Sequence, residues 1–225
     1  MDSVSSTDCG TAVRRPTESA SDQEPGQRPD NLSGMATRRT KAKSPAQDGW
    51  LLLIYKVPSE SSRARVAVWR ELKRLGGFYV QQAVCVLPDR EELRAGMEKV
   101  REKVTELGGS SVFLTLTDVG DDAQDQFVEG FRTQSAKEYA EIVEECETKF
   151  VKEIEFERFR ENYTFEEAEE IRQDLEKLRR WLAKVEDRDW MDADGKELAR
   201  AKVADCERLL EEFEADVYER TEGKV

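Results

Sequence analysis

The stretch that decides the fold is residues 50–88, which read WLLLIYKVPSESSRARVAVWRELKRLGGFYVQQAVCVLP. Residues 50–55 are an apolar run of strand-forming residues, too short to cross a bilayer. Apolar residues then recur at Val68, Leu72 and Leu75, a spacing that is typical of one buried helix face. The glycine pair that follows permits the left-handed backbone that ends a helix. The stretch therefore predicts a strand, then a helix, then more strand.

Two further strands and a helix complete the predicted sheet module. Residues 78–87 are strand-like and long enough to bend near Gln82 into two short strands. We expect a helix after them, with Asp89 as its N-cap. Its predicted apolar face consists of Leu93, Met97, Val100, Val104 and Leu107. A strand at 111–117 follows, with three aliphatic residues on one side and Phe113 on the other. The order βαββαβ predicts an α+β fold, a ferredoxin-like sandwich with two helices on one face of an antiparallel sheet.

From residue 121 onward the apolar pattern is helical. One very long helix, expected to end near Asn162, carries the stripe Phe127, Phe131, Tyr139, Ile142, Cys146, Phe150 and Ile154. Thr164 and Glu167 have the spacing of a capping box. The next helix has heptad-spaced apolar residues at Ala168, Ile171, Leu175, Leu178, Leu182 and Val185. The last has Leu198, Val203, Cys206, Leu210, Phe213 and Val217. We expect the last two helices to form an antiparallel, coiled-coil-like hairpin against the long one.

The chain is therefore expected to have three parts. Residues 1–47 are polar and almost free of large apolar side chains, so they cannot offset the entropy of ordering and are predicted to be disordered. Residues 48–118 form the ferredoxin-like domain, and residues 119–225 form an acidic helical bundle. We expect the heptad seam to pack within the chain; the alternative is a homodimer or a partner protein bound through helices 121–221.

Charge is unevenly distributed along the chain, whose net charge is −13. Residues 48–118 hold 11 Lys and Arg against 10 Asp and Glu, whereas residues 119–225 hold 18 against 33. An acidic surface repels phosphate backbones over a Debye length of about 8 Å. Any contact with nucleic acid is therefore expected in the N-terminal half.

The residue inventory argues against catalysis. The chain has no histidine, which removes the usual general base and imidazole metal ligand. Its four cysteines are far apart and form no CxxC pair, so the spacing suits neither a zinc site nor a secreted disulfide framework. The glycine pairs form no GxGxxG motif, and residues 1–10 have neither the basic nor the apolar region of a signal peptide, so none is expected. We expect a cytoplasmic protein without a membrane span, metal, cofactor or enzymatic activity.

Two ordered motifs resemble the N-terminal domain of the chromate resistance protein ChrB. The first group consists of LIYKVP (53–58), VWRELKRLG (68–76) and QQAVCVLP (81–88). The second consists of TF (164–165), LEKLRRWL (175–182) and DRD (187–189). The resemblance covers nearly all of residues 48–225. It implies a role in chromate-responsive control of chromate export genes, and a ferredoxin-like sheet similar to that of PaaX-type regulators. Many family members carry a second, C-terminal domain, whose activity is not expected in this chain.

The sheet module is also similar to that of small CRISPR adaptation proteins, some of which cleave phosphodiesters with metal ions. Those proteins place an acidic residue after the first tyrosine, where this chain has Lys56. This departure argues against a nuclease. PaaX-type repressors carry an upstream helix-turn-helix, and none is visible here. Contact with DNA would then depend on other basic residues.

The predicted anion- or DNA-binding residues are Lys56, Arg63, Arg65, Arg70, Lys73 and Arg74. Three of these arginines lie seven and four residues apart and share a helix face roughly opposite Leu72. Arginine presents paired N–H donors, so the cluster suits an oxyanion such as chromate, and it equally suits DNA phosphates. The alternative is a solvated face with ion pairs to Glu71 or to the acidic helices.

Four other motif residues have more open roles. We expect Trp69 to be a core or interdomain anchor and Cys85 to be a buried, unreactive thiol. Gln81 and Gln82 either satisfy backbone groups or face a ligand. Together these features predict a non-catalytic regulatory or sensory protein of a chromate resistance system. The alternative is an interaction module that docks a partner through its acidic helices.

Overall fold

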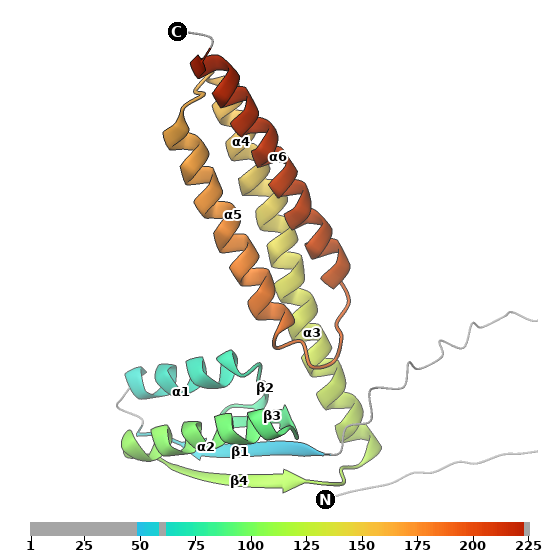
Figure 1. Ribbon diagram of the computed structural model, residues 1–225. Helices are drawn as coiled ribbons and strands as arrows, with labels where there is room; N and C mark the ends of the chain where they lie inside the picture. Colours follow the sequence, from blue (N-terminus) through green and yellow to red (C-terminus); the bar gives the residue numbers. More distant parts are fainter. Residues whose placement is uncertain (1–48, 59–61, 223–225) are drawn as a thin grey trace, which may run out of the picture. The chain divides into compact units, whose positions relative to one another are not determined.

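A computed structural model describes residues 49–58 and 62–222 (Figure 1). The predicted disordered tail at 1–47 lies outside the described residues. The sheet strands are β1 (Trp50–Lys56), β2 (Phe78–Gln81), β3 (Val84–Pro88) and β4 (Ser110–Leu116). Helix α1 (Ser62–Arg74) follows β1, and α2 (Glu91–Glu106) follows β3.

The strands form one antiparallel sheet in the order β2-β3-β1-β4. Both α1 and α2 lie on the same side of it (Figure 1). The α+β class is confirmed, and the strand order and the placement of both helices agree with the predicted ferredoxin-like sandwich. The expected bend falls at Gln82 and Ala83, where Ala83 adopts a positive φ of 66° and the chain turns from β2 into β3.

Side chains of β1 alternate between the two sheet faces. Leu51 and Leu53 are fully buried in the core shared with α1 and α2, whereas Ile54 is exposed. On β4 the expected alternation is present, but its aliphatic side is the exposed one. Val112 and Leu114 are exposed, whereas Phe113 packs against the core. Periodicity alone separates the two sides of a strand and does not say which one helices cover.

The helical region consists of α3 (Asp121–Glu145), a π-helical turn η1 (Cys146–Phe150), α4 (Val151–Phe159), α5 (Phe165–Glu186) and α6 (Lys196–Glu222). Elements α3, η1 and α4 follow one another without a break and form the expected long helix. The π turn was not predicted. The apolar stripe takes steps of four residues, from Ile142 to Cys146, Phe150 and Ile154, and each step rotates it by about 40° in an α-helix of 3.6 residues per turn. A wider turn absorbs part of that drift and keeps all four side chains buried.

Helix α3 belongs to both hydrophobic clusters of the described chain. Its first turns pack against the sheet, where the Trp50 ring centroid lies 5.1 Å from that of Phe127 and 5.8 Å from that of Phe131. The Trp50 Nε1–H also donates to the Gln124 carboxamide at 2.6 Å. Further along, α3 contributes Tyr139 and the stripe after it to the helical cluster. The exact division at residues 48–118 and 119–225 stays a prediction.

All six heptad-seam residues of α5 are buried against the other helices, so the seam packs within the chain. Ion pairs join α5 to α6, as between Arg179 and Glu207, and between Arg200 and Glu186 at 2.5 Å. The Thr164 side chain accepts from the Glu167 backbone N–H at 3.2 Å and caps α5 as predicted. The predicted homodimer or partner contact through 121–221 stays a prediction.

Two predictions about helix residues were wrong. Asp89 does not cap α2, because Arg90 occupies the N-cap position without a side-chain cap and the Asp89 carboxylate pairs with Arg94 instead. Leu198 is 54% exposed and does not belong to the α6 stripe. Ala199 takes its place and is fully buried, because it lies four residues before Val203 whereas Leu198 lies five before it.

The segment 187–191 connects the sheet module with the helical region. The Trp190 Nε1–H donates to the Leu75 carbonyl oxygen at 3.1 Å, and the Arg90 guanidinium lies 4.9 Å from the Trp190 ring centroid. Arg188 pairs with Glu138 of α3. The DRD motif at 187–189 is therefore part of the contact between the sheet module and the helical region.

The buried seam predicts a strong effect of a buried charge. Leu178 is 5% exposed, so Leu178→Asp places an unpaired carboxylate among apolar side chains and should lower the free energy of unfolding by about 3–5 kcal/mol. Gln173→Asp adds the same charge at an exposed position of α5 and should change stability little. Urea unfolding of both variants measures this. Equal midpoints would show that the seam is not packed in solution.

Candidate functional site

Helix α1 presents a stripe of three arginines to solvent. Arg63, Arg70 and Arg74 fall within about 40° of one another around the helix, and all three are exposed. Arg74 forms an exposed pair with Glu71 at 2.7 Å. Within the part of the chain that the structure describes, no carboxylate pairs with Arg63 or Arg70. These two line a shallow hollow on the surface of α1. We call Arg63, Arg70 and Arg74 the basic stripe.

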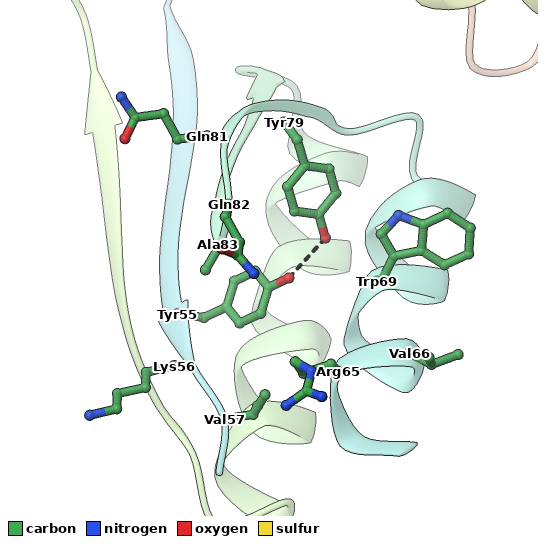
Figure 2. Close-up of a pocket in the computed structure, with 10 residues that line it drawn as sticks. All are labelled: Tyr55, Lys56, Val57, Arg65, Val66, Trp69, Tyr79, Gln81, Gln82 and Ala83. Carbon is green, nitrogen blue, oxygen red and sulfur yellow. Dashed lines mark hydrogen bonds between the residues drawn. The ribbon is translucent and has the colours of Figure 1, made fainter. Parts of the chain in front are cut away.

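The structure does not bring the other three predicted basic residues to this stripe. Lys73 donates to the Gln134 carboxamide of α3 at 2.7 Å, and burial lowers its pKa. Lys56, at the end of β1, borders the groove beside α1, but its side chain points away from α1 (Figure 2). Arg65 lies on the opposite side of α1 from the stripe and lines a groove beside the β2–β3 hairpin. The predicted six-residue cluster is thus divided among separate surfaces.

The groove beside α1 is the larger feature, with a cavity volume of about 830 Å³ (Figure 2). Its lining residues are Tyr55, Lys56, Val57, Arg65, Val66, Trp69, Tyr79, Gln81, Gln82 and Ala83. Strand β1 and the hairpin supply one wall, and α1 supplies the other. None of these ten residues is acidic.

Two tyrosines define the sheet wall of the groove. The Tyr55 and Tyr79 hydroxyls lie 3.0 Å apart and share a hydrogen bond. Burial and this bond raise the pKa of Tyr79, so its hydroxyl stays neutral at physiological pH. One shared bond uses one of the two hydroxyl hydrogens, which leaves a donor for a ligand.

Trp69 and the two glutamines have different placements from those expected. Trp69 is 47% exposed and forms part of the helix wall, so the first of its two expected roles, a core anchor, was wrong. The helix period explains this, because Trp69 lies about 100° from Val68 and so leaves the buried face. Both Gln81 and Gln82 are exposed and border the groove, but the Gln81 side chain points away from Tyr55 and Tyr79 (Figure 2).

Cys85 is fully buried under α1, as predicted. Burial raises the pKa of its thiol to about 12. The thiolate is the reactive form of cysteine, so this side chain is chemically quiet at neutral pH.

Sequence reasoning missed Tyr55 and Tyr79 as a pair. They lie 24 residues apart, and only the register of the sheet brings them together. The β2–β3 pairing contains an irregularity between Tyr79 and Gln81, and the Tyr55 backbone N–H donates to the Ala83 carbonyl oxygen at 3.0 Å. The available signal was an aromatic residue near one end of each strand. Whether two such residues meet depends on the register of the strands, which the sequence does not give.

The described residues offer neither a metal cluster nor a membrane-spanning helix. No group of three or more His, Cys, Asp or Glu side chains there is arranged to hold a metal ion. No helix among them is long and apolar enough to span a membrane.

Comparison with known proteins identifies one family. A family model described as Protein ChrB, N-terminal, matches residues 65–224, which run from α1 to the end of the helical region. Protein ChrB of Cupriavidus metallidurans is 30% identical over 98 residues, which are 44% of this chain and 30% of that protein. The chain thus matches less than a third of this relative's length. No solved structure matches the chain significantly.

The Cys85 environment predicts slow alkylation. With a thiol pKa of about 12, only about one thiol in ten thousand is ionised near pH 8, since each pH unit below the pKa costs a factor of ten. We expect iodoacetamide to leave Cys85 unmodified in the folded protein and to label it after unfolding in guanidinium chloride. Peptide mass spectrometry reads each site separately. Rapid labelling of Cys85 in the native protein would contradict this placement.

Proposed function

Because the chain belongs to the family described as Protein ChrB, N-terminal, we propose that it is a non-catalytic regulatory or sensory protein of a chromate resistance system. We propose that it acts by recognising an anion through the basic stripe of α1. The candidate ligands are DNA phosphate and an oxyanion such as chromate. The observation that carries the proposal is that Arg63 and Arg70 are exposed and that, among the described residues, no carboxylate forms an ion pair with either of them.

The charge of α1 supports this proposal. The helix holds Arg63, Arg65, Arg70, Lys73 and Arg74 against the single acid Glu71. Every other described helix carries more acidic than basic residues or lies in the acidic half of the chain. An anion that approaches this molecule therefore finds its most favourable helical surface on α1.

The geometry of the stripe favours an extended anion. Arg63 and Arg70 are seven residues apart, which is about 10 Å along a helix axis at 1.5 Å per residue. The surface between them is a shallow hollow rather than an enclosed pocket. Arginines spread along an open helix suit successive phosphates of a nucleic-acid backbone. A single oxyanion would require both side chains to converge on it.

The salt dependence of binding tests the proposal. We expect the full chain to bind a duplex fragment from its own promoter region, with affinity that falls as salt rises. Each phosphate contact contributes a slope of about −0.9 in log affinity against log salt, so Arg63→Gln/Arg70→Gln should make the slope shallower by about 1.8. Fluorescence anisotropy at several salt concentrations measures both slopes.

The matched control is Arg180→Gln/Lys184→Gln, which removes the same charge from exposed positions on α5. It should leave the slope unchanged. Calorimetric titration of chromate, with sulfate as competitor, tests the oxyanion instead, because sulfate has the same charge and a similar shape. If neither duplex nor chromate binds the wild type at micromolar concentration, the regulatory proposal fails.

Exposed aromatic residues favour a second candidate function, protein docking through the helical region. Phe159 is 86% exposed at the end of α4, and Phe156 and Phe165 beside it are also largely exposed. The turn between α4 and α5 therefore presents three phenyl rings to solvent. Apolar groups of this size at one surface are typical of an interaction site.

The docking candidate predicts self-association or partner binding that depends on these rings. Phe159→Ser/Phe165→Ser should abolish any dimer seen by sedimentation velocity and leave the melting temperature nearly unchanged, because neither ring is buried. Leu198→Ser, which removes an exposed apolar side chain from α6, is the control. A dimer that persists in the double variant would assign the contact to another surface.

A further inference from the structure

The groove between α1 and the β2–β3 hairpin has a ligand chemistry of its own. Its lining does not include Arg63, Arg70 or Arg74. Its cavity volume of about 830 Å³ lies within the range of small-molecule sites. The walls come from packed elements, because Val68 and Leu72 of α1 are fully buried against the sheet.

Aromatic side chains form both walls of this groove. Trp69 stands on the helix wall, and Tyr79 and Tyr55 stand on the sheet wall (Figure 2). The 47% exposure of Trp69 is unusual for so large an apolar side chain on a packed helix. Indole and phenol faces stack well on planar ring systems, including nucleobases.

Polar groups lie beside these rings. The Gln82 carboxamide offers both a donor and an acceptor, which is the pattern that reads the edge of a base. The shared Tyr55–Tyr79 hydrogen bond leaves one hydroxyl donor over. A ring ligand without hydrogen-bonding edges would use neither group.

A positive charge completes the set. Arg65 lies on the α1 wall near Val57, at the side of the groove where Tyr55 stands (Figure 2). Guanidinium groups bind phosphate through paired N–H donors. No carboxylate among the ten lining residues opposes an anion in the groove.

We infer that this groove binds one nucleotide, with its base stacked on Trp69, its edge hydrogen-bonded near Gln82 and its phosphate held by Arg65. The nucleotide is either a free mononucleotide or one unit of a single-stranded nucleic acid, since both present the same chemistry. This inference goes beyond the proposed function, because the basic stripe lies on another side of α1. Each can fail without the other.

Calorimetry of the full chain with three probes tests which part of the ligand the groove recognises. Adenosine 5′-monophosphate should bind at least about tenfold more tightly than ribose 5-phosphate, which lacks the base, because stacking supplies much of the affinity. It should also bind more tightly than adenosine, which lacks the phosphate. A single-stranded oligodeoxyadenylate distinguishes the two sources of the nucleotide. Tighter binding of the oligonucleotide than of the mononucleotide, if Trp69→Ala removes the difference, assigns the groove to a nucleic-acid chain, and the reverse order of affinities assigns it to a free nucleotide.

Variants then locate the binding. Trp69→Ala should weaken adenosine 5′-monophosphate by about tenfold or more, and Trp69→Phe should retain part of the affinity. Arg65→Gln should weaken the two phosphorylated probes and leave adenosine unaffected. Arg63→Gln removes an equal charge from the basic stripe and is the matched control, with no expected effect. Circular dichroism melting checks that each variant is folded, as expected for exposed positions.

Two outcomes would overturn the inference. One is the absence of binding by both adenosine 5′-monophosphate and the oligonucleotide at millimolar concentration. The other is binding that Trp69→Ala leaves unchanged, which would place the ligand elsewhere. Loss of duplex binding in Arg63→Gln/Arg70→Gln with normal nucleotide binding would separate the basic stripe from the groove.

Discussion

The rest of the structure depends on one constraint, the close approach of the backbone at the end of α1 to the 187–191 segment and to the sheet. Gly76 has a φ of +75°, and a Cβ there would lie 2.7 Å from both the Arg188 Cβ and the Trp190 Nε1. A Cβ on Gly77 would lie 2.5 Å from the Cys85 sulfur. Any side chain at either position would therefore push the helix away from the sheet or from the 187–191 segment. The glycine pair ends α1 and also brings the sheet core and the helical region into contact.

This constraint gives α1 three different faces. Its buried face, with Val68 and Leu72, packs on the sheet, and the two glycines that follow leave room for this close approach. One remaining side then turns toward the hairpin and carries Arg65 and Trp69, while the other carries the basic stripe. Lys73, nearer the helix end, donates to Gln134 of α3. The basic stripe and the groove wall therefore depend on how α1 packs on the sheet, and not only on the clustering of basic residues in the sequence.

The sequence predicted most of the fold because its periodic signals are local. The succession of strands and helices along the chain, the bend at Gln82, the N-cap at Thr164 and the heptad seam all depend on residues within one element or one turn. The π turn at Cys146–Phe150 was not predicted, because the apolar stripe of the long helix has a regular four-residue spacing there and gives no sign of a wider turn. The candidate site was predicted less well. One-dimensional spacing placed Arg63, Arg70 and Arg74 together correctly. Lys56 and Lys73 were assigned to the same surface, although the Lys56 side chain points away from α1 (Figure 2) and Lys73 forms a hydrogen bond with α3.

Ion pairs are unevenly distributed between the helical region and α1, which explains how a strongly acidic chain can have one helix with a basic surface. In the helical region, most arginines and lysines pair with carboxylates of their own helix or of a neighbouring one, as in the pairs Arg179–Glu207, Arg172–Glu214 and Lys202–Glu147. The surplus of acid there therefore remains at the surface. On α1 the only acid is Glu71, and it pairs with Arg74, at the end of the stripe away from Arg63.

Because screening limits such fields to about 8 Å at physiological ionic strength, acidic side chains farther away than this do not cancel the charge of α1. The net charge of −13 describes the whole chain and not the surface that an anion meets. A local excess of arginine on α1 is enough to create a positively charged surface there. The same packing of α1 on the sheet leaves Trp69 exposed toward the hairpin. The charged face and the aromatic groove therefore both follow from how α1 packs next to the glycine pair.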